Sequence, residues 1–398
     1  MPEAVWIIGT DMVKIGRYPE RDVVDLAADA ALGALADAQV TVQDLQVMAV
    51  GNMSQLATAV QKQIGQTGIP AYNVASACAT GAMAVRVVHM AIKSGEADMG
   101  LAIGVEQMGK AGLLGPAGQA RNSEKQVFAP SGRRGAVLPT EGVLGTGLMP
   151  GVFAQAGMEY ASRNDGVGFE QFARIAEKNH AHSSLNPLAQ YQKKFSLDEV
   201  MNAEMIAYPN TILMCSPTGD SGAAVVLVSD AKLKTLDPDV QKRAVKISAS
   251  VLTTDPWTEN GNELPDVNTL TRAAADQAYA MAGVGPEDLD LVELHDCFST
   301  AELIHYDNLR LCEPGGAGAF IDSGAPWRDG KTPVNVSGGL VSKGHPISAT
   351  GIINIFEVMT HLRGEAGDRQ IEGAKVGMTH VIGLGNSCGI HILERRAA

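Results

Sequence analysis

The chain has 398 residues, of which 45% are hydrophobic and 44 are glycine, and it carries a formal net charge of −13. This length exceeds what one ordinary hydrophobic core organises and suits two similar halves with an insertion. The acidic balance, without a basic cluster, argues against a nucleic-acid partner. Five scattered cysteines form neither a disulfide framework nor a zinc site. No uncharged apolar run reaches the roughly 18 residues of a membrane span.

The ends of the sequence carry no recognisable targeting signal. The first residues lack the basic region and the long apolar core of a signal peptide, and the last five residues contain no peroxisomal address. The expected location is therefore the cytoplasm.

In chain order, apolar spacing predicts alternating strands and helices at residues 5–9, 22–37, 45–50, 80–93 and 99–105. From about residue 110 to 215, Gly- and Pro-containing stretches surround polar helical runs, which predicts an inserted loop domain. A buried strand follows at residues 222–228. We therefore expect an N-terminal half over residues 1–243, including the loop domain, and a C-terminal half over residues 244–398.

Cys78 lies in the segment NVASACATG at residues 73–81, between an extended stretch and an apolar helix. It should therefore lie on a turn at a helix N-terminus, where backbone N–H groups and the helix dipole favour a thiolate. The small neighbouring residues leave room for an acyl group and let backbone amides approach its oxygen. A buried structural cysteine is the alternative, because that is the commoner fate of a lone cysteine.

A second segment, NVSGGLVSKGHPISATG at residues 335–351, repeats this pattern around His345. In both segments Asn-Val precedes a turn, and an Ala-Thr-Gly triplet then opens an apolar helix. The two triplets are 270 residues apart in the sequence. A second pair of matching segments begins at residues 27 and 274, in the same order. Two such matches predict a duplicated βα unit.

A third segment, LHDCFS at residues 294–299, follows a short apolar strand. Its His295, Asp296 and Cys297 should lie at the C-terminal edge of the sheet, where open α/β sheets bind ligands. A helix-capping histidine is the alternative. His-x-Cys is too short to chelate a metal well, so no metal site is expected. The other seven histidines are interpreted as structural or surface residues.

Glycine-rich segments do not predict a dinucleotide cofactor. Neither residues 315–318 nor residues 383–385 follow the order of strand, GxGxxG and helix that such a site requires. The segment at residues 383–385 instead predicts a tight turn between two strands.

Together the three segments around Cys78, His295 and His345 resemble the thiolase superfamily, with most similarity to its sterol carrier protein type, over essentially the full chain. The most specific matches lie at residues 295–303, 337–346 and 362–367, with further matches at 179–183, 195–200 and 215–218. The resemblance implies an α/β fold of two similar five-stranded halves in α-β-α-β-α layers, with an inserted loop domain. It also implies coenzyme A (CoA) thioesters as substrates, CoA and acyl-CoA as partners, no permanently bound cofactor, and a homodimer or dimer of dimers.

The resemblance also implies roles for single residues. Cys78 is the nucleophile that takes the acyl group, and His345 is the base that deprotonates it. His295 stands where most thiolases have an asparagine and would hold the enolate oxygen, by itself or through a water. The backbone N–H groups of Cys78 and Gly383 would form an oxyanion hole for the thioester oxygen. Claisen cleavage of a 3-ketoacyl thioester requires such a nucleophile, a proton carrier and donors for two oxygens.

One departure concerns the second catalytic cysteine. Ordinary thiolases carry it in a C-terminal Cys-x-Gly motif, whereas the aligned residues here are Val381, Ile382 and Gly383. Cys388 follows in an apolar run that is expected to form the last strand. Cys297 is therefore the better acid or base.

The sequence thus predicts a thiolase-type acyl-CoA C-acyltransferase that cleaves or forms 3-ketoacyl-CoA in fatty-acid or sterol side-chain metabolism. One alternative is a thiolase-like retro-aldolase acting on steroid side-chain CoA thioesters, with a small partner protein. Such enzymes tend to have catalytic tyrosines, so His295 and His345 argue against it, whereas Val381 is compatible with it.

Two further alternatives share the fold or the ligand. A decarboxylating ketoacyl synthase would use a Cys-His-His or Cys-His-Asn set, which the Gly-His-Pro and His-Asp-Cys-Phe strings fit less well. A non-catalytic lipid-binding or scaffold protein is the third alternative. The chain ends soon after its last expected strand, so no separate sterol carrier domain is expected.

Overall fold

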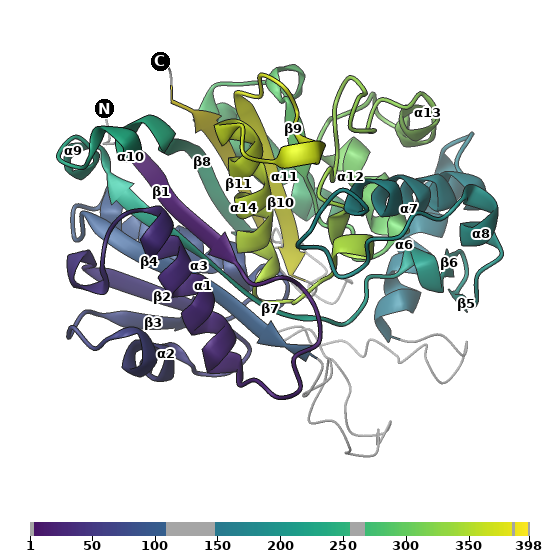
Figure 1. Ribbon diagram of the computed structural model, residues 1–398. Helices are drawn as coiled ribbons and strands as arrows, with labels where there is room; N and C mark the ends of the chain where they lie inside the picture. The colour runs from purple at the N-terminus through teal and green to yellow at the C-terminus, as the bar shows by residue number, and fades with distance from the viewer. Residues whose placement is uncertain (1–3, 109–147, 255–266, 384–386, 397–398) are drawn as a thin grey trace, which may run out of the picture.

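The computed structural model describes residues 4–108, 148–254, 267–383 and 387–396 (Figure 1). Its N-terminal half alternates strands and helices as the apolar spacing predicts. The Asp22 carboxylate caps the first helix by accepting the Val24 N–H at 2.9 Å. The elements are β1 (Val5–Met12), α1 (Val23–Asp37), η1 (Val42–Asp44), β2 (Val47–Gly51), α2 (Ala57–Ile64), β3 (Ala71–Val74), α3 (Thr80–Lys93), β4 (Met99–Gln107) and β7 (Asp220–Ser229).

The C-terminal half follows two short connecting helices, α9 (Asp230–Leu233) and α10 (Pro238–Arg243). The division expected between residues 243 and 244 falls between α10 and the next strand and stays a prediction. The elements of this half are β8 (Val245–Thr254), α11 (Val267–Ala282), η3 (Pro286–Asp288), β9 (Leu291–Glu293), α12 (Ser299–Asn308), α13 (Ala317–Asp322), the π-helical turn η4 (Gly339–Lys343), α14 (Thr350–Arg363), η5 (Gly367–Arg369), β10 (Val376–Gly383) and β11 (Ser387–Arg395).

The strands form one mixed sheet in the order β3-β2-β4-β7-β1-β8-β11-β10-β9. In the N-terminal half, β2 is parallel to β3 and β4, while β7 is antiparallel to β4 and β1. In the C-terminal half, β9 is parallel to β10, and β11 is antiparallel to β10 and β8. The second half therefore repeats the first, which confirms the prediction of two similar halves. They join where Trp6 and Ile7 of β1 pair with β8.

The C-terminal half differs from the expected five strands by having four. The segment at residues 334–336 takes the place of β3, but it pairs with β9 only through an isolated bridge between Val334 and Val292. The cause is the left-handed backbone of Asn335, whose φ of 54° ends the extended conformation. The Asn335 side-chain oxygen instead accepts the Leu294 N–H at 2.9 Å.

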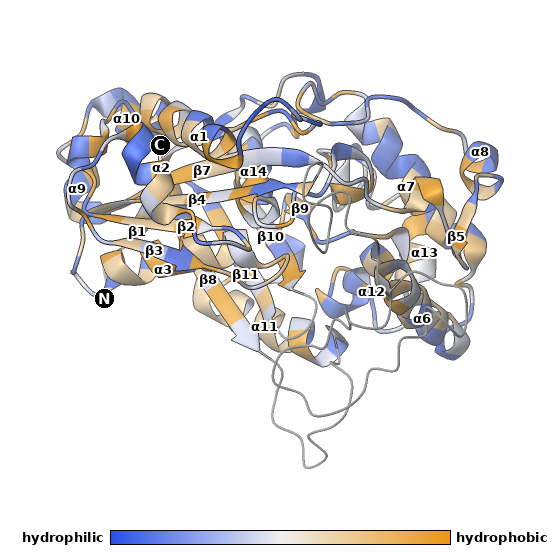
Figure 2. Ribbon diagram, turned by 90° about the horizontal axis from the view of Figure 1, so that it is seen from below, coloured by the Kyte–Doolittle hydropathy of each residue, from blue (hydrophilic) through white to orange (hydrophobic). Residues whose placement is uncertain are grey.

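Helices cover both faces of the sheet and separate its halves. α1 and α2 pack on the outer face of the N-terminal half, and α11 and α12 pack on that of the C-terminal half. α3 and α14 lie between the halves and contact strands of both. This is the expected α-β-α-β-α layering. The strands are mostly orange in Figure 2, as expected where a sheet is buried on both faces.

The two central helices begin in contact with each other. A Cβ atom on Gly81 would lie 2.9 Å from the Ser348 carbonyl oxygen, and one on Gly351 would lie 2.4 Å from a backbone nitrogen of α3. Only glycine permits two backbones to approach so closely. The repeated Ala-Thr-Gly motif therefore brings together the turns that carry Cys78 and His345.

The inserted loop domain lies beside the sheet, next to α12 (Figure 1). Its described elements are α6 (Leu148–Arg163), α7 (Phe169–Ser183), α8 (Leu197–Met201), β5 (Met205–Ala207), β6 (Asn210–Thr211) and η2 (Ile212–Met214). None of these described elements joins the main sheet, as the insertion predicts. The Gly-containing stretch at residues 112–118 and the turn at residues 384–385 lie outside the described residues. No described helix combines the length and the hydropathy that a bilayer crossing requires.

Candidate active site

Cys78 lies on the short turn between β3 and α3, two residues before the helix begins. The preceding residue, Ala77, has a left-handed φ of 45°, a conformation that residues other than glycine rarely adopt. The Thr80 hydroxyl holds this turn, because it donates to the Ala77 carbonyl at 2.6 Å and accepts the Ser76 N–H at 2.7 Å. The thiol is thereby fixed before a helix N-terminus, where the helix dipole favours an anion.

His345 contacts the thiol directly. Its Nε2 atom lies 3.2 Å from Cys78 Sγ, and its Nδ1 atom lies 2.7 Å from the Thr350 hydroxyl oxygen. That hydroxyl donates to the Pro346 carbonyl at 3.1 Å, so its oxygen accepts the hydrogen bond from Nδ1–H of His345. The ring nitrogen that faces Cys78 is therefore unprotonated and can accept the thiol proton.

The surroundings of His345 keep it neutral. Burial, followed by the charge of the neighbouring Lys343, lowers the pKa of His345 to about 3. Lys343 is itself buried and lies 3.5 Å from a Glu293 carboxylate oxygen. A neutral imidazole beside a thiol is the resting form of a general base and its nucleophile.

His295 lies edge-on to His345, with ring centroids 5.2 Å apart and ring planes at 76°. Neither ring nitrogen of His295 has a hydrogen-bond partner among the described residues. Burial, followed by the nearby His345 and His380, lowers the pKa of His295 well below its usual value. A neutral imidazole carries one N–H, so His295 has a donor available for a ligand oxygen.

Cys78, His295 and His345 bring one sulfur and two nitrogen atoms within 4.8 Å of one another. A thiolate with two imidazoles can also ligate a metal ion such as zinc. Among the described residues this is the only cluster of that kind. The expected lack of a metal site stays a prediction.

The structure separates the two candidates for the second cysteine. Cys297 lines the same cavity as Cys78, and burial, followed by the charge of Cys78, raises the pKa of Cys297 well above its usual value. Cys388 lies on β11 in the core against α11, where burial raises its pKa. Val381 packs against Cys78 in a small apolar cluster. The position that the resemblance aligns with the second cysteine of ordinary thiolases lies beside Cys78 and is occupied by Val381, which carries no acidic proton.

Gly383 ends β10 next to the turn that carries Cys78. A Cβ atom on it would lie 2.3 Å from the Ser76 carbonyl oxygen, so only glycine allows this approach. The hydroxyl oxygens of Ser76 and Ser387 are 2.6 Å apart and link the turn to the start of β11. The backbone segments of Cys78 and Gly383 are therefore neighbours, and their joint role as an oxyanion hole stays a prediction.

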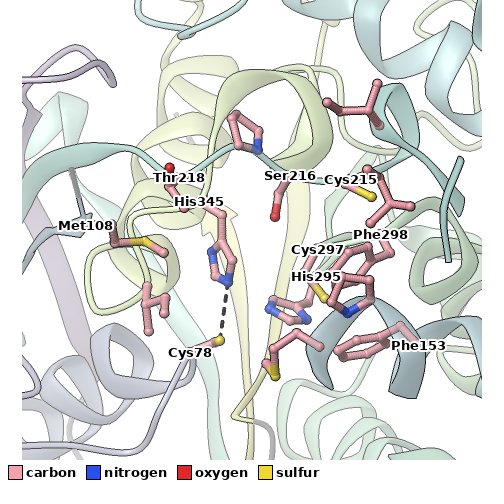
Figure 3. Close-up of a pocket in the computed structure, with 16 residues that line it drawn as sticks. Cys78, Met108, Phe153, Cys215, Ser216, Thr218, His295, Cys297, Phe298 and His345 are labelled. Carbon is pink, nitrogen blue, oxygen red and sulfur yellow. Dashed lines mark hydrogen bonds between the residues drawn. The ribbon is translucent and has the colours of Figure 1, made fainter. Parts of the chain in front are cut away.

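A cavity of about 290 Å³ contains these side chains (Figure 3). In Figure 3, His345 lies above Cys78, and His295 and Cys297 lie between this pair and the ring of Phe153. Phe153 and Phe298 are stacked, with centroids 5.4 Å apart. Most of the wall is apolar, and much of it comes from the loop domain through Met149, Phe153, Ile206 and Ile212. Such a cavity suits an uncharged hydrocarbon chain.

A buried charged network supports the site and was not predicted from the sequence. Asp296 accepts the Leu340 N–H at 2.7 Å and the Asn179 side-chain amide at 2.8 Å. Asn179 also donates to Glu302 at 2.7 Å, and Lys178 forms an ion pair with Glu302 at 2.8 Å, with both side chains fully buried. The network ties the end of β9 to η4. Lys178 and Asn179, two polar residues on the buried face of α7, are the sequence feature that could have indicated this network.

The role of Thr350, which orients His345, was missed, although the repeated Ala-Thr-Gly motif contains this residue. The seven other histidines are all buried, which agrees with the structural alternative of the sequence interpretation. Among them, His380 lies against the site, since its Nδ1 is 3.4 Å from the His295 backbone nitrogen.

Comparisons with known proteins identify relatives over the whole chain. The family descriptions "Thiolase, N-terminal domain" and "Thiolase C-terminal domain-like" match residues 5–201 and 256–395. Sterol carrier protein 2 of Bos taurus is 38% identical over 96% of this chain and 70% of its own length. Acetyl-CoA acetyltransferase of Methanothermobacter thermautotrophicus is 36% identical over 98% of this chain and 99% of its own length.

Solved structures share the fold. The Ltp2-ChsH2(DUF35) aldolase superposes with a TM-score of 0.79 at 21% identity, covering 100% of this chain and 99% of that one. Human mitochondrial 3-ketoacyl-CoA thiolase in complex with CoA superposes with a TM-score of 0.72 at 17% identity, covering 99% and 98% of the two chains. These likenesses confirm the expected architecture and, at such identities, concern the fold alone.

Proposed function

Because the chain belongs to the thiolase family and is an acyltransferase, we propose that it cleaves or forms 3-ketoacyl-CoA through an acyl-enzyme on Cys78. The observation that carries this proposal is the 3.2 Å contact between Cys78 Sγ and the unprotonated Nε2 of His345, inside an apolar cavity. A nucleophile, its base and a free donor together meet the needs of Claisen chemistry.

In the cleavage direction, His345 Nε2 takes the thiol proton as Cys78 Sγ attacks the 3-keto carbon. The bond between C2 and C3 then breaks, the acyl group stays on Cys78, and the electron pair forms the enolate of the departing thioester. The N–H of His295 holds the enolate oxygen. The Cys297 thiol gives its proton to C2, for which its raised pKa is suitable because it stays protonated at neutral pH.

The second half-reaction returns each group to its starting form. Cys297 takes the proton of the incoming CoA thiol, whose sulfur attacks the acyl carbonyl on Cys78. Backbone N–H groups of Cys78 and Gly383 hold the oxygen of the tetrahedral intermediate. The carbon–sulfur bond to Cys78 breaks, and His345 returns its proton to the Cys78 thiolate.

The apolar wall of the cavity favours a hydrocarbon acyl chain, which supports a role in fatty-acid or sterol side-chain metabolism. Acyl-CoA and CoA are the expected partners, without a permanently bound cofactor. A homodimer or dimer of dimers in the cytoplasm completes the proposal.

One observation favours a second candidate. Val381 replaces the second cysteine of ordinary thiolases beside Cys78, which also fits a retro-aldolase that acts on steroid side-chain CoA thioesters with a small partner protein. The two histidines at the site fit such an enzyme less well.

A panel of 3-ketoacyl-CoA and β-hydroxyacyl-CoA substrates, each with and without CoA, tests the proposal. Cleavage of 3-ketoacyl-CoA that requires CoA is the expected result. Release of an aldehyde or ketone without CoA would support the retro-aldolase. Binding of lipid without any product would contradict both and support a non-catalytic lipid carrier.

A further inference from the structure

We propose that Glu106 is a positioning residue for the base of the site, because its carboxylate ties the turn that carries His345 to the strand ends next to the turn of Cys78. The inference rests on the proposed function, since it concerns the contact between the same nucleophile and base. Glu106 does not line the cavity, so it acts through its neighbours and not on the substrate.

Ser348 is the contact of Glu106 on the turn of the base. It lies between His345 and Thr350, the residue that orients the base. Its side chain is fully buried, and its hydroxyl donates to Glu106 Oε2 at 2.7 Å. The Thr350 N–H donates to the Pro346 carbonyl at 3.0 Å, so Ser348 lies inside one closed turn. A displacement of Ser348 would therefore move both the base and the threonine that orients it.

The end of β4 approaches the same turn through its backbone. A Cβ atom on Gly104 would lie 2.4 Å from the Ser348 carbonyl oxygen, so only glycine allows this approach. Glu106 follows two residues later, and strand residues two apart face the same side of a sheet. One strand therefore holds Ser348 twice, by contact of the main chains and by the Glu106 carboxylate.

Asn52 holds Glu106 in turn and reaches the turn of the nucleophile. Its buried side-chain amide donates to the Val105 carbonyl at 2.6 Å and to Glu106 Oε1 at 3.3 Å. The Asn52 backbone N–H donates to the Val74 carbonyl at 3.3 Å, where β3 ends and the chain turns toward Cys78. This chain of contacts therefore runs from the turn of the nucleophile, through Asn52 and Glu106, to the turn of the base.

The carboxylate is held by hydrogen bonds and not by a cation. No lysine or arginine among the described residues lies within ion-pair distance of Glu106, and burial raises the pKa of Glu106 while its bonds from Ser348 and Asn52 oppose that change. A partly buried carboxyl group without a cation costs free energy, and such groups gather at functional sites. Its bonds to two separate segments make Glu106 a bridge between them.

The contact that this bridge maintains is sensitive to distance. Cys78 Sγ and His345 Nε2 come from different halves of the chain and stand 3.2 Å apart. A misplacement of about 1 Å between reacting groups can cost about 10²-fold in rate. Glu106 therefore matters for catalysis although it lies outside the cavity.

Replacement of Glu106 tests this role with a probe that is not a substrate. Glu106→Ala should lower the rate of Cys78 alkylation by iodoacetamide, followed by peptide mass spectrometry, about 10- to 100-fold. The kcat for acylation by acetyl-CoA should fall by a similar factor, while KM stays within about twofold. Glu106→Gln keeps an oxygen that can accept the Ser348 hydroxyl, so it should restore both rates to within about threefold of the unmodified protein.

Ser348→Ala removes the other partner of the same bond. It should lower the alkylation rate by a similar factor, and the double variant with Glu106→Ala should lose little more than either single variant, because both changes break one shared contact. Multiplied losses in the double variant would overturn the proposal. So would an unchanged alkylation rate in Ser348→Ala, which stays informative even if Glu106→Ala does not fold.

Asp98→Ala provides the matched control, because the Asp98 carboxylate accepts the Ser229 hydroxyl at 2.8 Å directly before β4, at the opposite end of that strand from Glu106. It should lower the melting temperature but keep the alkylation rate within about twofold, since it is distant from the site. Equal alkylation losses in Asp98→Ala and Glu106→Ala would overturn the proposal. If alkylation depends on Glu106 but no acyl-CoA ever acylates Cys78, the proposed function fails and the positioning role stands.

Discussion

The turns that carry Cys78 and His345 are copies of one βα unit that perform different tasks. Each helix begins with a threonine whose hydroxyl donates to a carbonyl of the preceding turn. In the first copy the Thr80 oxygen accepts a backbone N–H and shapes the turn of the nucleophile. In the second copy the Thr350 oxygen accepts Nδ1–H of His345 and orients the base. The threonine hydroxyl therefore fixes the backbone of the Cys78 turn in one half and the tautomer of His345 in the other.

The two turns differ in length and support. The first is short and places Cys78 directly after the left-handed residue Ala77. The second includes η4, which the buried carboxylate of Asp296 holds through the Leu340 N–H. A short turn leaves little freedom for the thiol, whereas the longer turn is held by backbone hydrogen bonds to the buried carboxyl group of Asp296. The two halves share one βα scaffold, and the different roles of Cys78 and His345 depend on the differences between the two turns.

Replacing Cys78 by Ala should have the largest effect and test the first turn. We expect loss of all detectable thiolysis and of the acyl adduct, because no other side chain in the cavity has both a base in contact and a helix N-terminus behind it. The melting temperature should change little, since small residues surround this position. Peptide mass spectrometry after exposure to acetyl-CoA provides the measurement. An adduct found only on another cysteine would contradict the assignment.

Removing the histidines should separate the two half-reactions. His345→Ala should slow acylation by about 10²- to 10⁴-fold, the range for a lost general base. His295→Ala should spare acylation and slow carbon–carbon bond cleavage by an amount equivalent to about 3 kcal/mol, as for a lost oxyanion donor. Rapid-quench measurement of acylation, beside steady-state cleavage, distinguishes them. Equal losses in both half-reactions for both variants would remove the basis for separate roles.

The cysteine pair offers a matched comparison within the C-terminal half. Cys297→Ala should lower cleavage and enolate proton exchange by about 10²-fold or more, because it removes the proton carrier in the cavity. Cys388→Ala should stay within a few-fold of the unmodified protein, because its thiol lies in the core against α11. Deuterium exchange at C2 of acetyl-CoA measures the step directly. The reverse ranking would make Cys388 the proton carrier.

Thr350→Val and Thr80→Val compare the two copies at equivalent positions. Thr350→Val leaves the buried Nδ1–H of His345 without an acceptor and should lower acylation about 5- to 150-fold, equivalent to the 1–3 kcal/mol of an unsatisfied buried group. Thr80→Val should act mainly on stability, by about 1–3 kcal/mol in urea unfolding, because the Ser76 N–H loses its acceptor. If both variants affected only stability, the Thr350 hydroxyl would have no role in orienting the base.

The smallest expected effect concerns pH. Burial and Lys343 lower the pKa of His345 to about 3, so the acylation rate should change less than about twofold between pH 5.5 and 8. The unfolded state has a histidine pKa near 6.5, so this group's contribution to stability is complete above that pH. The contribution is lost as the pH falls from about 6.5 toward 3. Single-turnover acylation and urea unfolding across this range check both statements, and an acid limb near pH 6.5 would show that His345 is solvated.

Much of the site could be predicted because its signals are local. The small residues around Cys78, the repeated Ala-Thr-Gly triplet and the His-x-Cys spacing each describe one turn or one strand end. The preference for Cys297 over Cys388 also came from local context, and the structure places Cys297 in the cavity and Cys388 in the core. The buried network behind Asp296 could not be predicted, because its partners come from α7, α12 and η4 and meet only in the folded chain.

The sequence by itself determined the elements, the duplicated unit and the candidate residues, because hydrogen bonding and apolar spacing within a few residues decide where a helix or strand begins. Only the tertiary structure decided that Cys78 and His345, 267 residues apart, stand 3.2 Å from each other. It also decided that Nε2 of His345 is the unprotonated nitrogen, and which residues form the wall of the cavity around Cys78 and His345. The physical reason is the contact of two helix N-termini at Gly81 and Gly351, because close backbone packing between the halves is a property of the whole fold and not of either segment.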